Sequence, residues 1–181
     1  LKVIYPAFPA DAKGLLNTAF NDPNPVLYFE HKALYRSIRQ EVPEGYYTTE
    51  FGKASLIREG SNVTIITYGA GVHWAMEILD ELKIDSADLL DLRSLQPLDN
   101  GAICNSVSKT GKAIVLTEDS LTGSFASEIA AMISEECFES LDAPVYRVGS
   151  LETPIPFAKE LENQYLPKDR FKSKLQELLN Y

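Results

Sequence analysis

The first stretch whose residue types and spacing could do chemistry is Gly69-Ala70-Gly71, which stands between a predicted strand and a predicted helix. Asp91 follows twenty residues beyond the second glycine. This is most of a dinucleotide-binding fingerprint, in which glycines admit a pyrophosphate to the helix N-terminus. Trp74, however, occupies the place of the third small residue. A tight turn between strand and helix is therefore the favoured interpretation, and nucleotide binding is the weaker alternative.

A second candidate is the carboxylate pair Glu118-Asp119, at the predicted end of a strand. Sheets of alternating strands and helices usually carry their sites at such ends, and paired carboxylates can do acid–base work. No histidine, lysine or metal-binding cluster lies near the pair in sequence. A solvated strand end or a helix cap is the favoured interpretation, with acid–base chemistry as the alternative.

The hydroxyl-rich segment from Thr122 to Ser127 could suggest a serine nucleophile. It does not match the G-x-S-x-G elbow that exposes such a serine, and only His31 and His73 are available as a base. We expect Thr122 or Ser124 to cap the following helix instead.

A possible cation site lies at Asp22 and Asn24, just beyond the end of a predicted helix. The last carbonyl groups of a helix lack partners within the helix and carry partial negative charge. Together with one carboxylate they would suit a hard cation. On spacing alone, a plain turn is favoured.

These residues are positioned by alternating strands and helices. Val63 to Tyr68 is a continuous β-branched and aromatic run, typical of a strand buried on both faces, and Trp74, Ile78 and Leu82 follow at helical spacing. The alternation predicts an α/β fold with three αβα layers and a mostly parallel sheet. The later strands are predicted at 85–92, 113–117 and 144–148, and the later helices at 100–109, 123–138 and from about 168.

The beginning of the chain predicts a separate βαβ unit, with strands at 2–5 and 26–29 and a helix from Pro9 to about Phe20. The first residue is Leu1 rather than methionine, and no strand precedes this unit to pair with it. We therefore expect a piece of a longer polypeptide. Residues 31–52 read as an ordered connection, and residues 54–58 as an edge strand.

Composition narrows the function further. An apolar fraction of 45% suits a globular protein with a core, and the net charge of −9 makes nucleic acid or an anionic membrane an improbable partner. Cys104 and Cys137 both stand in apolar helical settings, where isolated cysteines act as small hydrophobic side chains. With no disulfide framework, zinc pattern, signal peptide or long apolar run, a cytoplasmic location is expected.

Read as a whole, the sequence resembles the C-terminal half of the beta subunit of thiamine-diphosphate-dependent 2-oxo acid dehydrogenases. The resemblance runs in order along nearly the entire chain. The residues that carry it include Asp11 to Leu16, Asp22 to Pro25, Glu30-His31-Lys32, Leu34-Tyr35-Arg36, Val42-Pro43, Gly60 to Thr64, Tyr68-Gly69, Val72-His73, Asp91 to Leu95, Pro97-Leu98-Asp99, Phe125 to Ile129, Leu141 to Pro144, Arg147-Val148, Glu152 to Pro154 and Tyr165-Leu166-Pro167.

The resemblance implies that residues 1–45 are the tail of a pyrimidine-binding domain and its connection, and that residues 46–181 form a transketolase-like C-terminal domain. The family's activating glutamate and active-site histidine would lie upstream of Leu1. The fragment would then contain no catalytic or cofactor-binding residue and would be inactive alone. In the full enzyme, the cofactor would be thiamine diphosphate with magnesium.

The resemblance also implies a structural potassium ion, with matching positions at Ala19, Phe20, Asp22 and Asn24. Phe125 to Ile129, together with residues 135–138 and 180–181, looks more like the branched-chain (2-oxoisovalerate) type than the pyruvate type. The implied partners are an alpha subunit or domain, a second beta subunit, and the basic subunit-binding domain of the acyltransferase core. A pyruvate dehydrogenase beta fragment and a non-catalytic binding module of the same fold are the alternatives.

Overall fold

The larger part of the molecule is built around a five-stranded sheet with the strand order β3-β5-β4-β7-β8. A computed structural model describes all 181 residues. Four strands run parallel, and β3 pairs antiparallel with β5 at one edge. The strands are β3 (Ser55–Arg58), β4 (Val63–Thr67), β5 (Ala87–Asp91), β7 (Ala113–Ser120) and β8 (Tyr146–Ser150). The predicted mostly parallel sheet and its edge strand are confirmed.

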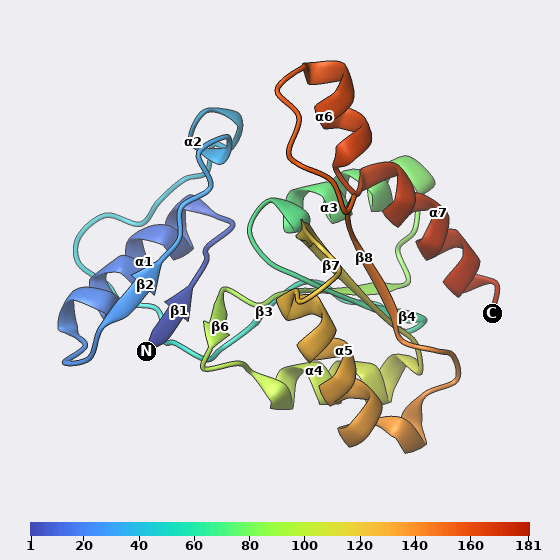
Figure 1. Cartoon of the computed structure of the whole chain (residues 1–181). Coiled ribbons are helices and arrows are strands. Elements are labelled where there is room, and N and C mark those ends of the chain that lie inside the picture. The colour runs from blue at the N-terminus through green and yellow to red at the C-terminus, as the bar shows by residue number, and fades with distance from the viewer.

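Helices cover both faces of this sheet (Figure 1), as the three-layer prediction requires. On one face lie α3 (Ala70–Leu82) and α7 (Lys168–Leu179), and on the other lie α4 (Asn100–Thr110) and α5 (Phe125–Glu136). Asp99 caps α4, because its Oδ1 accepts a hydrogen bond from the Ala102 amide at 3.1 Å. Every residue of β4 and of β5 is buried, which agrees with the continuous β-branched sequence of β4.

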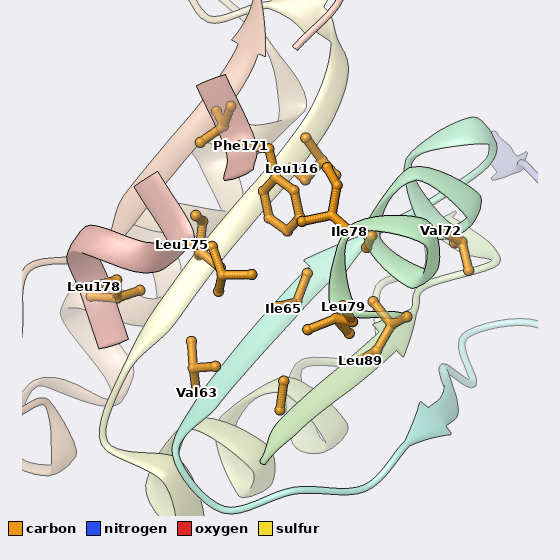
Figure 2. Close-up of a cluster of buried hydrophobic side chains, with 14 of the residues drawn as sticks. Val63, Ile65, Val72, Ile78, Leu79, Leu89, Leu116, Phe171, Leu175 and Leu178 are labelled. Carbon is orange, nitrogen blue, oxygen red and sulfur yellow. The ribbon is translucent and has the colours of Figure 1, made fainter. Parts of the chain in front are cut away.

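Each face of the sheet has its own hydrophobic core. Figure 2 shows the core under α3 and α7, where Leu79 from α3 and Phe171 and Leu175 from α7 meet Ile65 of β4. The core under α4 and α5 contains Ile66 of β4. Because Ile65 and Ile66 are consecutive, the alternation of side chains along one strand supplies both cores.

The beginning of the chain forms the predicted βαβ unit, with β1 (Lys2–Ile4), α1 (Pro9–Asn21) and β2 (Val26–Tyr28). The strands β1 and β2 are parallel. A short helix, α2 (Leu34–Ser37), lies in the predicted connection. Figure 1 shows this unit, in blue, beside the main sheet.

A strand that the sequence pattern did not predict joins the two parts. This is β6 (Ser94–Gln96), which pairs antiparallel with β1 and completes a three-stranded sheet in the order β2-β1-β6. Just before it, Arg93 donates to Asp11 Oδ1 of α1 at 2.8 Å and to the Lys53 carbonyl oxygen through two nitrogens. The proposed boundary at residue 45 stays a prediction, since the small sheet takes one strand from the later part of the chain.

The segment after β8 contains a second unpredicted element, α6 (Lys159–Tyr165), which precedes α7. The helix predicted at residues 123–138 is observed as α5, which ends at Glu136, and a turn of 3₁₀ helix, Phe138–Ser140, follows it. None of the helices combines the length and the apolar character needed to cross a membrane.

Candidate functional site at the carboxyl edge of the sheet

A cavity of about 420 Å³ lies beyond the carboxyl ends of β4 and β7. The chain leaves β4 toward one neighbour, β5, and later returns to the other side as β7, so this edge is a topological switch point of the sheet. Ligand sites of open α/β sheets form at such points. The cavity is lined from β1 to α6 by Tyr5, Phe29, Tyr68, Leu95, Thr117, Glu118, Asp119, Ile155, Glu162, Tyr165 and Leu166.

A histidine–carboxylate pair borders this cavity through Glu118, while its histidine, His31, lines a second cavity of about 620 Å³. His31 Nε2 lies 2.9 Å and 3.1 Å from the two carboxylate oxygens of Glu118. The hydrogen bond to Glu118 raises the pKa of His31, and this effect outweighs burial, which lowers it. His31 Nδ1 is buried and has no hydrogen-bonding partner in the chain. The raised pKa favours the imidazolium form of His31 beside the Glu118 carboxylate, and such a pair can exchange a proton.

The pair changes the interpretation of Glu118-Asp119. Sequence reasoning found no histidine nearby, and His31 is in fact 87 residues away along the chain. Asp119 does not join the pair; its Oδ1 accepts a hydrogen bond from the Ser120 amide at 2.8 Å. The two adjacent carboxylates therefore have separate roles, and only Glu118 is part of the histidine pair.

Aromatic side chains form the wall between the two sheets. The Tyr5 ring lies 5.6 Å from that of Tyr68 and 5.8 Å from that of Phe29, centre to centre. Tyr68 Oη lies 2.9 Å from Thr117 Oγ1. Burial and the nearby Glu118 carboxylate raise the pKa of Tyr5 to about 12, and burial raises the pKa of Tyr68. Both phenols therefore stay protonated and can donate hydrogen bonds.

The glycine turn before α3 is a close-packed corner. Gly69 has φ of +56°, and a Cβ there would lie 2.9 Å from the Tyr5 ring. A Cβ on Gly71 would overlap Thr67 Oγ1. The glycines are thus explained by packing, which agrees with the tight turn favoured from the sequence.

Asp91, the acidic residue of the partial fingerprint, is fully buried rather than presented to a ligand. Its Oδ1 accepts from the Arg93 amide at 3.1 Å, while Oδ2 has no partner. Burial raises the pKa of Asp91 to about 8. The carboxyl group is therefore neutral at pH 7 and serves the junction between the sheets.

The four residues predicted to bind potassium gather at the end of α1. Asp22 forms an ion pair with Lys2 of β1, and its Oδ1 accepts from the backbone and side-chain nitrogens of Asn24 at 2.9 Å and 3.2 Å. The Ala19 carbonyl oxygen accepts from the Asp22 amide, and the Phe20 side chain is exposed. The Lys2 ammonium thus already neutralises the carboxylate, so this donor set does not fit a cation while that pair holds. Potassium binding stays a prediction.

The capping hydrogen bond expected from Thr122 or Ser124 at the start of α5 is not formed. Ser124 occupies the N-cap position of α5, but its hydroxyl makes no cap hydrogen bond and instead donates to the Leu121 carbonyl oxygen at 3.2 Å. The Thr122 amide donates to Glu152 Oε1 at 2.8 Å, outside the helix. Neither histidine bonds to these hydroxyls, because His31 pairs with Glu118 and His73 Nε2 bonds to the Ala7 carbonyl oxygen. The structure therefore gives the serine-nucleophile alternative no support.

Comparison with known proteins agrees with this architecture. The sequence profile of the family described as "Transketolase, C-terminal domain" matches residues 52–170. A solved structure titled "Split gene transketolase, inactive beta4 tetramer" superimposes with a TM-score of 0.77 at 26% identity, covering 99% of this chain and 57% of that one.

Curated relatives match along the whole length. The 2-oxoisovalerate dehydrogenase subunit beta of Bacillus subtilis (strain 168) is 44% identical over 185 residues, covering 100% of this chain and 57% of the relative. The pyruvate dehydrogenase E1 component subunit beta of the same organism is 47% identical over 172 residues, covering 94% and 53%. The chain therefore spans about half the length of the curated relatives it matches.

Proposed function

Because the chain belongs to the transketolase C-terminal domain family, we propose that it is part of the beta subunit of a 2-oxo acid dehydrogenase. The observation that carries the proposal is its similarity to beta subunits of both the branched-chain and the pyruvate type along its whole length. Fold alone would not suffice, since one fold serves many functions.

In the full enzyme, thiamine diphosphate with magnesium would supply the carbanion stabilisation that decarboxylation of a 2-oxo acid requires. We propose that the residues of this chain do not form a site for that cofactor by themselves. The close packing of Gly69 against the Tyr5 ring at the N-terminus of α3, and the burial of Asp91, support this. We therefore propose that the chain contributes to assembly and docking, and that it is inactive alone.

We propose that exposed apolar side chains mediate the assembly with an alpha subunit and a second beta subunit. Phe20 of α1 is 82% exposed, and Ile155 and Phe157, before α6, are 70% and fully exposed. Exposed large apolar side chains can mark contact with other proteins, and Ile155 and Phe157 lie two residues apart in one loop. Phe157→Ser should weaken co-purification with a co-expressed alpha subunit, while Tyr181→Ser, at an exposed position on the last residue, is the matched control.

For the acyltransferase core, we propose electrostatic docking of its basic subunit-binding domain in the cytoplasm. The net charge of −9 supports this, because opposite charges speed and strengthen association in a salt-dependent manner. Binding of the purified domain should weaken as the salt concentration rises from about 50 mM to 500 mM. An affinity that is the same at both salt concentrations would contradict an electrostatic interface.

We propose 2-oxoisovalerate-type acids as substrates of the assembled enzyme, on the strength of the resemblance in residues 125–129, 135–138 and 180–181. The test is to purify the assembly that contains this polypeptide and to measure its turnover of 2-oxoisovalerate and of pyruvate with an artificial electron acceptor. Faster turnover of 2-oxoisovalerate is expected. A preference for pyruvate would overturn the branched-chain assignment but not the family, and the absence of both activities would overturn the proposal.

A further inference from the structure

The two cysteines lie against each other in space. Cys104 of α4 and Cys137, which follows α5, have their sulfur atoms 2.9 Å apart, and both are free thiols. Both cysteines pack in or against the hydrophobic core, as expected from the sequence, but the sequence did not predict that they contact each other. A disulfide bond is about 2.05 Å long, so the two sulfur atoms are within about 1 Å of bonding distance.

The packing of two helices brings the pair together. Helices α4 and α5 lie side by side over the same face of the sheet (Figure 1). Cys137 is buried in the core between them, and Cys104 is partly exposed at its margin. Cys104 Sγ also lies 4.0 Å from Met132 Sδ and 3.7 Å from Glu136 Oε2. The thiols are therefore held near each other before any reaction, which removes most of the entropic cost of joining them.

Cys137 lies where the backbone can make the remaining movement without distorting a strand. This residue comes after the last residue of α5 and before the single 3₁₀ turn Phe138–Ser140. A shift there affects only that turn and the last hydrogen bond of α5, from the Cys137 amide to the Ile133 carbonyl oxygen. Cys104 is fixed inside α4, so Cys137 is the partner that moves.

We propose that Cys104 and Cys137 form a reversible disulfide that ties α4 to the end of α5, with a peroxide as the oxidant. The partly exposed Cys104 thiolate attacks one oxygen of the peroxide, the O–O bond breaks, and Cys104 becomes a sulfenic acid while hydroxide takes up a proton as water. The sulfur of Cys137 then attacks the Cys104 sulfur, the S–O bond breaks, and a second water leaves. Two thiols and hydrogen peroxide thus give one disulfide and two waters.

The surroundings make this reaction slow at neutral pH. Burial, together with the neighbouring Cys137 thiol and Glu136 carboxylate, raises the pKa of the Cys104 thiol to about 12. Only the thiolate is the nucleophile, so the rate should rise about tenfold per pH unit below that value. A bond that forms slowly and is reversed by thiols agrees with a cytoplasmic setting, where disulfides are usually transient.

The test uses the purified 181-residue chain, treated with hydrogen peroxide at pH 8.5 and then alkylated in denaturant. The expected product has lost two hydrogens, about 2 Da, takes up no alkyl group, and yields a peptide that links Cys104 to Cys137. Its melting temperature should rise by roughly 5–10 °C, because the bond closes a loop containing β7. Dithiothreitol should reverse both changes.

Two variants control for other oxidation products. Cys104→Ser keeps one thiol and should show neither the loss of mass nor the rise in melting temperature. Met132→Leu removes the neighbouring thioether, whose oxidation would add an oxygen, and should still form the bond. The proposal is overturned if the oxidised wild-type chain takes up two alkyl groups, if it carries oxygen on separate cysteines, or if it forms disulfide-linked dimers. It does not depend on the proposed function, since it needs neither cofactor nor partner.

Discussion

The five-stranded sheet has helices packed on both faces, whereas the three-stranded sheet has one helix on one face. In the small sheet, Ile4 is fully buried on the side of α1, while Leu27 on the opposite side is 45% exposed. Without β6 this sheet would be only the two-stranded pair of β1 and β2, and an isolated two-stranded pair is marginally stable at best. The large sheet therefore carries the stability of the molecule, and the small one depends on its attachment to it through β6 and Arg93.

The largest expected effect on stability comes from a substitution in the hydrophobic core of the large sheet. Phe171 of α7 is fully buried in the core shown in Figure 2, so Phe171→Ala should lower the free energy of unfolding by about 3–5 kcal/mol. Phe20 of α1 is 82% exposed, and Phe20→Ala should change stability by no more than about 0.5 kcal/mol. Urea unfolding of both variants measures the difference. Equal losses would contradict the burial of Phe171 and the exposure of Phe20.

A second prediction concerns the buried carboxyl group at the junction of the sheets. The pKa of Asp91 is about 8 in the folded chain and near 3.8 in an unfolded one. At a pH between these two pKa values, unfolding releases the proton from Asp91. The free energy of unfolding should therefore fall as the pH rises from about 4 to 8, by on the order of a few kcal/mol. Asp91→Asn keeps the acceptor for the Arg93 amide and stays neutral.

Urea unfolding at pH 5 and pH 8.5 tests this. The loss of stability at the higher pH should be smaller in Asp91→Asn than in the wild type, and Asp119→Asn, at the exposed end of β7, should retain the wild-type loss. An unchanged pH dependence in Asp91→Asn would show that this carboxyl group ionises normally.

A third prediction concerns the contacts of Arg93, which attach the small sheet to the large one. Arg93→Ala removes the contacts to Asp11 and to the Lys53 carbonyl oxygen, and should cost about 1–3 kcal/mol locally. Amide hydrogen exchange should become faster in β1 and α1 and stay unchanged in β4 and β7. Faster exchange in both sheets alike would mean that they unfold as one unit. Arg93→Lys retains the charge but not the forked contacts, and should show an intermediate effect.

The smallest effect is expected at the His31–Glu118 pair, which also joins the two parts. The pKa of His31 is higher in the folded chain than in the unfolded one, so protonated His31 stabilises the fold. This stabilisation is complete at pH below about 6.5 and is lost as the pH rises through the pKa of His31 in the folded chain. Because Glu118 is partly exposed, the effect should be about 1 kcal/mol or less. Glu118→Gln should lower the pKa of His31 in an NMR titration, and the chain has only one other histidine, His73, as an internal reference.

Local pattern predicted most of the regular structure but few of its long-range contacts. The run from Val63 to Thr67 and the helix after it were clear, because a strand buried on both faces and an amphipathic helix each have a distinctive period. The strand β6 was missed because three residues between Arg93 and Pro97 are too few to show a period. The helix α6, Lys159–Tyr165, was missed because its polar sequence has no apolar stripe.

The site was harder to predict for a different reason. His31 and Glu118 each follow or end a strand, so the rule that sites form at carboxyl ends identified both neighbourhoods but not their meeting. Cys104 and Cys137 are likewise brought together only by the packing of α4 on α5. Pairs of this kind depend on how separate elements are oriented, which no single stretch of sequence records.

The pairing of β1 with β6 has a consequence for how the protein is made. Ile4 meets Ser94, so the first strand leaves the ribosome about 90 residues before its neighbour. At ordinary rates of translation this takes roughly 5–20 s, during which one side of the nascent β1–β2 pair has free hydrogen-bonding groups. A chain interrupted before residue 96 would keep that side open, and such truncated products should be the ones that chaperones retain.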